Sequence, residues 1–145
     1  MTEASNTFIL LVDDEPVGRS LRKLVLETRG YRVLAVGEID VALVSLQNEP
    51  IGLVILDYFL EGITGTELAK RMREVKPEVP ILLLSASCSE PDGMEHVDGY
   101  LSKLEPVHTI EEKISALLER RGLHACLGLE ARKSALPDRA QSGER

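Results

Sequence analysis

The stretch FILLVDDEP, residues 8–16, joins an apolar run directly to three acidic residues. Residues 8–12 are all apolar and are typical of a buried β-strand. Asp13, Asp14 and Glu15 follow without a break. Adjacent carboxylates repel one another, and burying them is costly unless another charge compensates them. A chain with this much negative charge at the end of a buried strand therefore needs a cationic partner there.

The composition is typical of one globular domain. The chain has 145 residues, of which 43% are hydrophobic and 28% are charged, and this length is enough to bury a core. No apolar run approaches the roughly 18 residues of a membrane-spanning helix, and the polar N-terminus lacks the pattern of a secretion signal. Two cysteines without metal-ligand spacing favour a reducing compartment, so we expect a cytoplasmic protein. The net charge of −7 argues against broad contact with nucleic acid.

Five apolar runs rich in Val, Ile and Leu alternate with segments of helical periodicity. Three of the runs are nearly continuous, which is typical of strands covered on both faces. Strands that alternate with helices predict a parallel sheet built from βαβ units. We therefore expect an α/β fold: a flavodoxin-like, doubly wound, five-stranded parallel sheet in the order 2-1-3-4-5, with helices on both faces. The predicted strands are residues 8–12, 31–36, 51–57, 79–85 and 99–102.

Four helices are clear from their apolar periodicity, and one is doubtful. The doubtful helix, the fourth along the chain, falls in residues 87–97, where Pro91 and Gly93 interrupt it, so we expect it to be shortened. The last helix begins either with Pro106 in its first turn or with a capping box at Thr109. The apolar stripe of the first helix consists of Val17, Leu21, Leu24 and Val25.

Acidic residues end two of the strands that lie next to each other in the expected sheet. Ligands of open parallel sheets bind outside the carboxyl ends of the strands, where the strand order reverses. Asp13 and Asp14 end the first strand and Asp57 ends the third, so three carboxylates converge there. Such a cluster is stable mainly around a hard cation, and Mg²⁺ suits carboxylates, waters and a phosphate.

Two further strand ends add groups of a different kind. Ser85 follows the fourth strand and offers a hydroxyl, and Lys103 follows the fifth and offers an ammonium group. Carboxylates, a metal, a hydroxyl and one fixed positive charge are suited to phosphoryl transfer, which depends on positioning and charge neutralisation.

Four ordered motifs carry a family resemblance. They lie at the strand ends, keep their order and approximate spacing, and together resemble the receiver domain of two-component response regulators. The resemblance covers residues 8 to about 121. The motifs are LLVDDEP (10–16), VILDYFLEGITG (54–65), ILLLSA (81–86) and GYLSK (99–103).

The resemblance implies a metal site and a phosphoacceptor. Asp57 would accept a phosphoryl group from the phosphohistidine of a partner kinase. Asp14 and Asp57 would bind Mg²⁺ directly and Asp13 would bind it through water. The backbone carbonyl of Phe59 would complete the protein ligands.

The resemblance also implies phosphoryl-binding and switch residues. Lys103 would pair with the phosphoryl oxygens and Ser85 would donate a hydrogen bond to one of them. Tyr100 would turn inward when Ser85 moves toward the phosphate. Gly65 matches the glycine that opens the third helix.

The function implied by the resemblance is a phosphorylation-operated signalling switch. It would catalyse only its own phosphorylation and dephosphorylation, and phosphorylation would change the surface near the fourth and fifth helices. The expected partners are a sensor histidine kinase or phosphotransfer protein and one downstream protein, without nucleic acid or membrane insertion. We expect a flexible N-terminus at 1–7, the receiver domain at 8–121 and a partly disordered tail at 122–145. A stand-alone regulator, a phosphorelay intermediate and a piece of a hybrid kinase all remain open.

Three features depart from the usual receiver pattern. Leu104 follows Lys103 where most receivers have a cis proline, so we expect a trans bond and an altered loop at 103–106. The interval from Ser85 to Lys103 is about one helical turn short. Phe59 lies two positions after the phosphoacceptor, where a large side chain hinders the hydrolytic water, so we expect a long-lived phosphoryl group.

Two other function classes compete with the switch. A receiver-shaped binding module that works without phosphorylation is supported by Leu104 and the short fourth helix, and is opposed by the intact acidic triad. A Mg²⁺-dependent phosphohydrolase with an aspartyl nucleophile, of the haloacid-dehalogenase type, needs a second Asp where this chain has Phe59. Flavin binding lacks a phosphate-cradling loop, because residues 13–18 would repel a phosphate.

Overall fold

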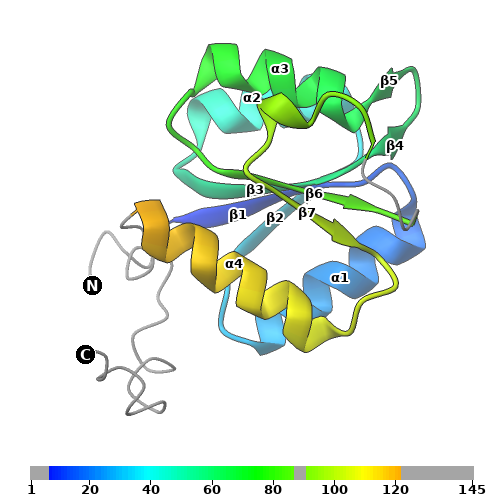
Figure 1. Ribbon diagram of the computed structural model, residues 1–145, viewed down its shortest axis with the longest axis vertical. Helices are drawn as coiled ribbons and strands as arrows, with labels where there is room; N and C mark the ends of the chain where they lie inside the picture. The colour runs from blue at the N-terminus through cyan, green and yellow to red at the C-terminus, as the bar shows by residue number, and fades with distance from the viewer. Residues whose placement is uncertain (1–6, 87–90, 122–145) are drawn as a thin grey trace.

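Five parallel strands form the central sheet. The computed structural model describes residues 7–86 and 91–121, and the sheet has the order β2-β1-β3-β6-β7 (Figure 1). This is the predicted order 2-1-3-4-5. The predictions for residues 1–6 and 122–145 lie outside the described residues. The strands are β1 (Phe8–Val12), β2 (Val33–Val36), β3 (Ile51–Asp57), β6 (Ile81–Ser85) and β7 (Gly99–Ser102).

Helices cover both faces of the sheet, as the continuous apolar runs predict. All seven residues of β3 are buried, because this strand lies in the middle of the sheet between two helical layers. One core cluster packs between the sheet and the pair α1 and α4, and the other between the sheet and the pair α2 and α3 (Figure 1). The helices are α1 (Pro16–Thr28), α2 (Ile39–Asn48), α3 (Gly65–Val75) and α4 (Val107–Arg121).

The apolar stripe of α1 faces solvent rather than the core. Val17, Leu21 and Leu24 are 73%, 60% and 57% exposed, whereas Leu26 is buried against the sheet. The periodicity therefore predicts the helix correctly, but most of its apolar face has no partner among the described residues. Polar contacts with the end of β1 hold the first half of the helix instead.

The connection from β6 to β7 contains a single turn of 3-10 helix, η2 (Met94–His96), in the part that the structure describes. This confirms the shortened fourth helix for residues 91–97, whereas residues 87–90 lie outside the description. Gly93 adopts a left-handed conformation with φ of 87°, and a Cβ atom there would lie 2.7 Å from the Cβ of Thr66 on α3. The short connection therefore packs closely against α3.

Arg73 of α3 fastens this connection. Its guanidinium donates hydrogen bonds to the carbonyls of His96 at 3.1 Å and Val79 at 3.0 Å. It also pairs with the carboxylate of Asp98, which in turn accepts a hydrogen bond from the Ile81 amide at 2.8 Å. One side chain thus joins α3, η2 and the start of β6.

Two local features settle or extend the sequence predictions. The last helix begins at Val107, directly after Pro106, so the alternative start at Thr109 is wrong. A small antiparallel pair, β4 (Phe59–Leu60) and β5 (Ile63–Thr64), lies between β3 and α3 and was not predicted. None of the helices in the described residues is long and apolar enough to cross a membrane.

Candidate functional site

Three carboxylates meet at the carboxyl ends of β1 and β3. These strands are parallel neighbours, with Val12 opposite Leu56, so the residues that follow them come together at one edge of the sheet. One oxygen from each of Asp13, Asp14 and Asp57 lies within 4.8 Å of the others. Asp13 is 1% exposed and Asp57 is 6% exposed, so this charge is taken out of water and needs compensation.

Asp13 is held by several donors. Its Oδ1 accepts a hydrogen bond from the Glu15 amide at 3.0 Å, and its Oδ2 accepts one from Arg22 Nη1 at 2.7 Å. The Nζ of Lys103 lies 3.7 Å from the same Oδ2. Burial alone raises the pKa of Asp13, but the Glu15 hydrogen bond and the charges of Lys103 and Arg22 outweigh it and hold the pKa below its ordinary value.

Asp57 is less well compensated. Its Oδ2 lies 3.0 Å from Lys103 Nζ, whereas its Oδ1 is buried without a hydrogen-bond partner. Burial raises the pKa of Asp57, and the nearby charge of Asp13 adds to this, so that the attraction of Lys103 offsets only part of the shift. A buried carboxylate oxygen without a donor is rare and calls for an explanation, such as a cation that binds there.

The backbone that follows Asp57 depends on Gly65. The Gly65 amide donates to the Tyr58 carbonyl at 2.6 Å. A Cβ atom on Gly65 would lie 2.4 Å from the Asp57 carbonyl oxygen, which no real side chain can tolerate. The glycine at the start of α3 therefore allows the close backbone approach that positions Asp57.

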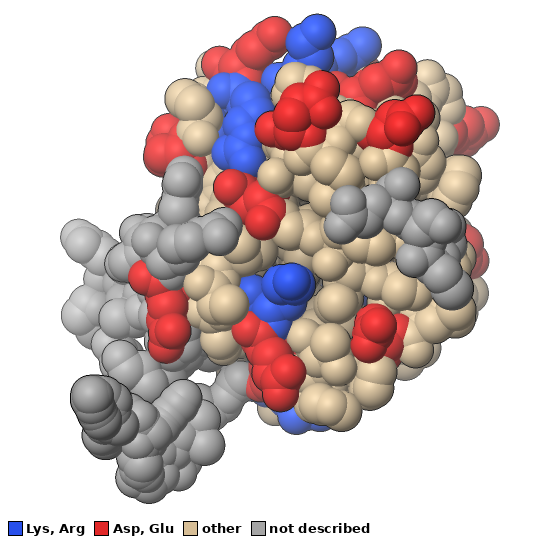
Figure 2. Space-filling view, in the orientation of Figure 1, with Lys and Arg blue, Asp and Glu red and all other residues tan. Residues whose placement is uncertain are grey.

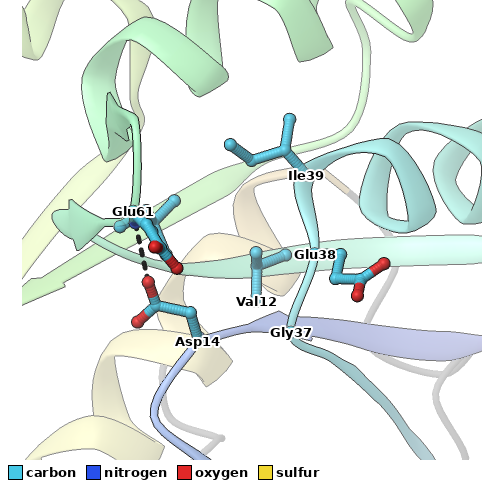
Figure 3. Close-up of a pocket in the computed structure, with 7 residues that line it drawn as sticks. Val12, Asp14, Gly37, Glu38, Ile39 and Glu61 are labelled. Carbon is cyan, nitrogen blue, oxygen red and sulfur yellow. Dashed lines mark hydrogen bonds between the residues drawn. The ribbon is translucent and has the colours of Figure 1, made fainter.

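Asp14 lies at the edge of a shallow cavity beside the cluster. Figure 3 shows its carboxylate directed to the backbone of Glu61, whose amide donates to Asp14 Oδ2 at 2.7 Å. The β4–β5 turn thus reaches the metal ligands of the predicted site. The other residues that line the cavity are Val12, Gly37, Glu38, Ile39 and Leu60.

The loop that carries Lys103 is closed by Ser102. The described residues contain no cis peptide bond, so the bond before Leu104 is trans, as expected. The Lys103 amide donates to the Ser85 carbonyl at 2.7 Å. The hydroxyl of Ser102 accepts a hydrogen bond from the Leu104 amide at 3.1 Å, and its carbonyl accepts one from the Glu105 amide at 3.1 Å. This turn aims Lys103 at Asp57 without a proline.

The remaining predicted residues lie around the cluster. Ser85 is buried at the end of β6, where it pairs with Ser102 of β7. Tyr100 is half-buried and packs against the core cluster on the side of α2 and α3. Phe59 is 62% exposed, and its ring contacts the ring of Tyr58 edge to face at a centroid distance of 4.8 Å. The metal-binding role of the Phe59 carbonyl and the switch role of Tyr100 stay predictions.

Two arginines of α1 contact Asp13 and were missed by the sequence analysis. Arg22 donates to the carboxylate, and Arg19 Nη1 donates to the Asp13 carbonyl at 2.8 Å. No pattern in the sequence indicates either contact, because both depend on how α1 packs against the end of β1. Ser102 was also missed, because a serine at the end of a strand carries no distinguishing pattern.

The donor set fits Mg²⁺. All the side-chain ligands are carboxylate oxygens, which hard cations prefer. Their mutual distances of up to 4.8 Å suit a site in which at least one carboxylate binds through water. The partnerless Oδ1 of Asp57 is an open ligand position.

Basic side chains do not form a continuous patch on the face shown in Figure 2. Lys and Arg residues lie in small separate groups among acidic ones. This face therefore lacks the clustered positive charge that contact with a nucleic-acid backbone requires.

Comparison with known proteins gives a consistent result. The sequence model of the family described as "Response regulator receiver domain" matches residues 9–115. The alkaline phosphatase synthesis transcriptional regulatory protein PhoP of Bacillus subtilis is 33% identical over 124 residues, which are 83% of this chain and 52% of that protein. A probable transcriptional regulatory protein of Picosynechococcus is 36% identical over 124 residues, 78% of this chain and 49% of that protein. The chain thus spans about half the length of these curated relatives.

Solved structures of the same shape include a metal complex and a kinase complex. The response regulator TrrA of Thermotoga maritima, in complex with Mg²⁺-BeF, has a TM-score of 0.72 and 33% identity, and the match covers 77% of this chain and 99% of that chain. The complex of TrrA with the histidine kinase ThkA matches with a TM-score of 0.71 and the same identity, over 77% and 98% of the two chains.

Proposed function

This chain belongs to the response regulator receiver domain family, and from that membership we propose that Asp57 accepts a phosphoryl group from a histidine kinase or phosphotransfer protein and thereby operates a signalling switch. The observation that carries the proposal is the environment of Asp57. Its Oδ1 is buried without a partner, and its Oδ2 lies 3.0 Å from Lys103. One oxygen is thus available for attack while the other is already paired with the cation that phosphoryl oxygens require.

The proposed reaction exchanges one bond for another. An oxygen of the Asp57 carboxylate bonds to phosphorus while the phosphorus–nitrogen bond of phosphohistidine breaks. The imidazole leaves with the bonding electron pair and takes up a proton, and Asp57 becomes an acyl phosphate. Dephosphorylation is a separate step, in which water attacks phosphorus, the bond between phosphorus and the Asp57 oxygen breaks, and inorganic phosphate and the Asp57 carboxylate are released.

Each residue of the cluster has a separate task in this reaction. Asp14 and Asp57 would hold Mg²⁺ directly, Asp13 would hold it through water, and the Phe59 carbonyl would supply a further ligand. The bound ion supplies neutralisation of the charge that develops on the transferred group. Lys103 binds a phosphoryl oxygen, since its ammonium group already lies between the carboxylates of Asp57 and Asp13.

We assign the output of the switch to Ser85 and Tyr100. Ser85 lies at the end of β6, beside the site, and its hydroxyl would move toward a phosphoryl oxygen. Tyr100 of β7 lies on the same face of the sheet two residues before Ser102, the neighbour of Ser85 across the strands. Its inward turn would reshape the surface beside η2 and the start of α4, where a downstream protein would bind.

The phosphodonor would dock on the exposed apolar face of α1. This face begins with Val17, four residues after Asp13, and continues through Leu21 and Leu24. Leu104, next to Lys103, is 73% exposed and adds an apolar side chain on the other side of the site. A related regulator of known structure binds a histidine kinase. The cytoplasmic location expected from the sequence is part of this proposal.

Incubation with acetyl phosphate and Mg²⁺, followed by intact-mass measurement, tests the proposal. We expect a gain of one phosphoryl group in the wild type and in Asp40→Asn, whose carboxylate lies on the exposed side of α2. We expect no gain in Asp57→Asn or in the presence of EDTA.

The same experiment separates the competing functions. Release of phosphate over many turnovers from a generic phosphoester would favour a phosphohydrolase. Absence of any modification by acetyl phosphate and by a phosphorylated kinase would favour a binding module that works without phosphorylation. Modification that persists in Asp57→Asn would show that another residue is the acceptor.

A further inference from the structure

Arg22 occupies a position that neither the metal site nor the phosphoacceptor explains. Its Nη1 donates to Asp13 Oδ2 at 2.7 Å, and the Arg22 side chain is only 22% exposed. The other oxygen of Asp13 accepts the Glu15 amide at 3.0 Å. Both oxygens of this predicted metal ligand are therefore engaged before any ion binds.

The helix is built so that Arg22 can reach Asp13. Gly18 lies one turn before Arg22 on the same side of α1. A Cβ atom on Gly18 would lie 3.0 Å from Glu15 Oε1, which accepts a hydrogen bond from the Gly18 amide, and at the ordinary contact distances of 3.8 Å from Asp13 Oδ2 and 3.9 Å from Arg22 Nη1. A longer side chain growing from this position would fill the space in which the guanidinium and the carboxylate meet. Gly18 thus lies beside the ion pair and leaves room around it.

Arg19 contacts the backbone of Asp13 rather than its carboxylate. Its Nη1 donates to the backbone carbonyl of Asp13 at 2.8 Å. A Cβ atom on Gly37 would lie only 2.2 Å from this nitrogen, so the guanidinium packs directly against Gly37. Arg19 therefore holds the backbone after β1 against the loop after β2. Arg22, by contrast, contacts the carboxylate itself.

The charge of the cluster depends on Arg22. Three carboxylates contribute three negative charges, and Lys103 and Arg22 contribute the two positive charges that lie against carboxylate oxygens. Mg²⁺ therefore meets a smaller attractive field than the acidic triad alone would produce, and the pair is buried enough to resist screening by salt. Arg22 must also share or release Asp13 Oδ2 when a metal-bound water approaches it.

We propose that Arg22 is a resident counter-cation that competes with Mg²⁺ for Asp13 and lowers the affinity of the site for the free ion. The inference rests on the metal site of the proposed function. The guanidinium balances Asp13 when no ion is bound, so that the triad is tolerated in the metal-free fold. Arg22 also favours the state in which Mg²⁺ and a phosphoryl group are both bound. The phosphoryl group adds negative charge, which Mg²⁺ and the Arg22 guanidinium then neutralise together.

The dissociation constant of Mg²⁺ alone, measured by isothermal titration calorimetry on the full chain, tests the proposal. We expect Arg22→Met and Arg22→Gln to bind Mg²⁺ about five- to tenfold more tightly than the wild type, where tenfold corresponds to about 1.4 kcal/mol. Met keeps the apolar stem, so this variant preserves packing if Gln does not fold. Arg22→Lys keeps the charge and is expected to stay within about twofold of the wild type.

Lys23→Gln is the matched control. It removes the same charge from the same helix, but Lys23 pairs with Glu27 at 2.9 Å in solvent and lies outside the site. We expect its Mg²⁺ affinity to match that of the wild type. Unchanged or weaker binding in folded Arg22→Met, or equal tightening in Lys23→Gln, would overturn the proposal. Absence of Mg²⁺ binding in the wild type would instead overturn the metal site of the proposed function.

Discussion

At the scale of single residues, the ionised form of Asp57 works against folding in the metal-free protein. Burial raises the pKa of Asp57 above its ordinary value, and the attraction of Lys103 does not cancel this effect. The folded state therefore binds a proton more tightly than the unfolded chain. The resulting loss of stability is absent below the unfolded-state pKa, grows as the pH rises and is complete above the folded-state pKa.

Replacing Asp57 with Asn is expected to stabilise the metal-free protein. The neutral amide avoids the cost of a buried charge beside Asp13, and we expect a gain of about 1 kcal/mol, or about 3–5 °C in Tm. Thermal unfolding in EDTA at pH 7.5 measures this. In the wild type, Mg²⁺ should raise Tm more than in Asp57→Asn. A lower Tm for Asp57→Asn in EDTA would mean that the Lys103 pair outweighs burial.

We propose that Phe59 controls the lifetime of the phosphoryl group. It lies two residues after Asp57, is largely exposed and is held by its edge-to-face contact with Tyr58. We expect Phe59→Asn to lose phosphate about three- to tenfold faster, because a smaller polar side chain admits and orients water. Loss of the phosphorylated mass with time measures the rate, and an unchanged rate would refute the role of Phe59.

At the scale of elements, the short connection between β6 and β7 depends on α3. The η2 turn has too few residues to bury an apolar face of its own, and Arg73 ties it to α3 through hydrogen bonds to carbonyls and a pair with Asp98. Removing the guanidinium leaves the half-buried Asp98 carboxylate without this cation and several carbonyls without this donor.

Arg73→Met is therefore expected to lower the free energy of unfolding by about 2–3 kcal/mol, since loss of one partner from a partly buried ion pair is costly. Urea unfolding of the metal-free protein measures the change. Arg71→Met is the control, because Arg71 is exposed on the same helix, and we expect a change within about 0.5 kcal/mol. Equal effects of the two substitutions would show that Arg73 does not fasten the connection.

At the scale of the whole molecule, the docking face proposed on α1 begins beside the site. The apolar face begins a few residues after Asp13 and is solvated in the described structure. A phosphodonor that binds this face would bring its phosphohistidine close to Asp57. A small phosphodonor needs no such surface.

Leu21→Asp is expected to slow phosphoryl transfer from a phosphorylated cognate kinase about tenfold or more, while phosphorylation by acetyl phosphate stays within about twofold of the wild type. Val44→Asp is the matched control, since Val44 is 56% exposed on α2, on the opposite face of the sheet (Figure 1). The kinase is identified by screening candidates with the wild-type chain. Equal slowing by both donors would place the defect in the site rather than in docking.

The sequence by itself determined the strand order, the helices on both faces and the acidic cluster, because these depend on local periodicity and on where strands end. Continuous apolar runs such as residues 51–56 are typical of strands buried on both faces, as in a parallel sheet covered by helices. Residues that end neighbouring strands then meet, whatever their side chains are. The predicted meeting of Asp13, Asp14 and Asp57 is confirmed by the structure.

Only the tertiary structure decided which groups compensate this cluster and which apolar face stays in water. Arg22 reaches Asp13 because the packing of α1 brings the two side chains together, and no sequence period records such a contact. The apolar residues of α1 have the spacing of a face that packs on a core, yet most of them are exposed. The direction in which a helix packs depends on all the elements around it. Long-range contacts of this kind depend on the whole fold, whereas periodicity reports only on each segment.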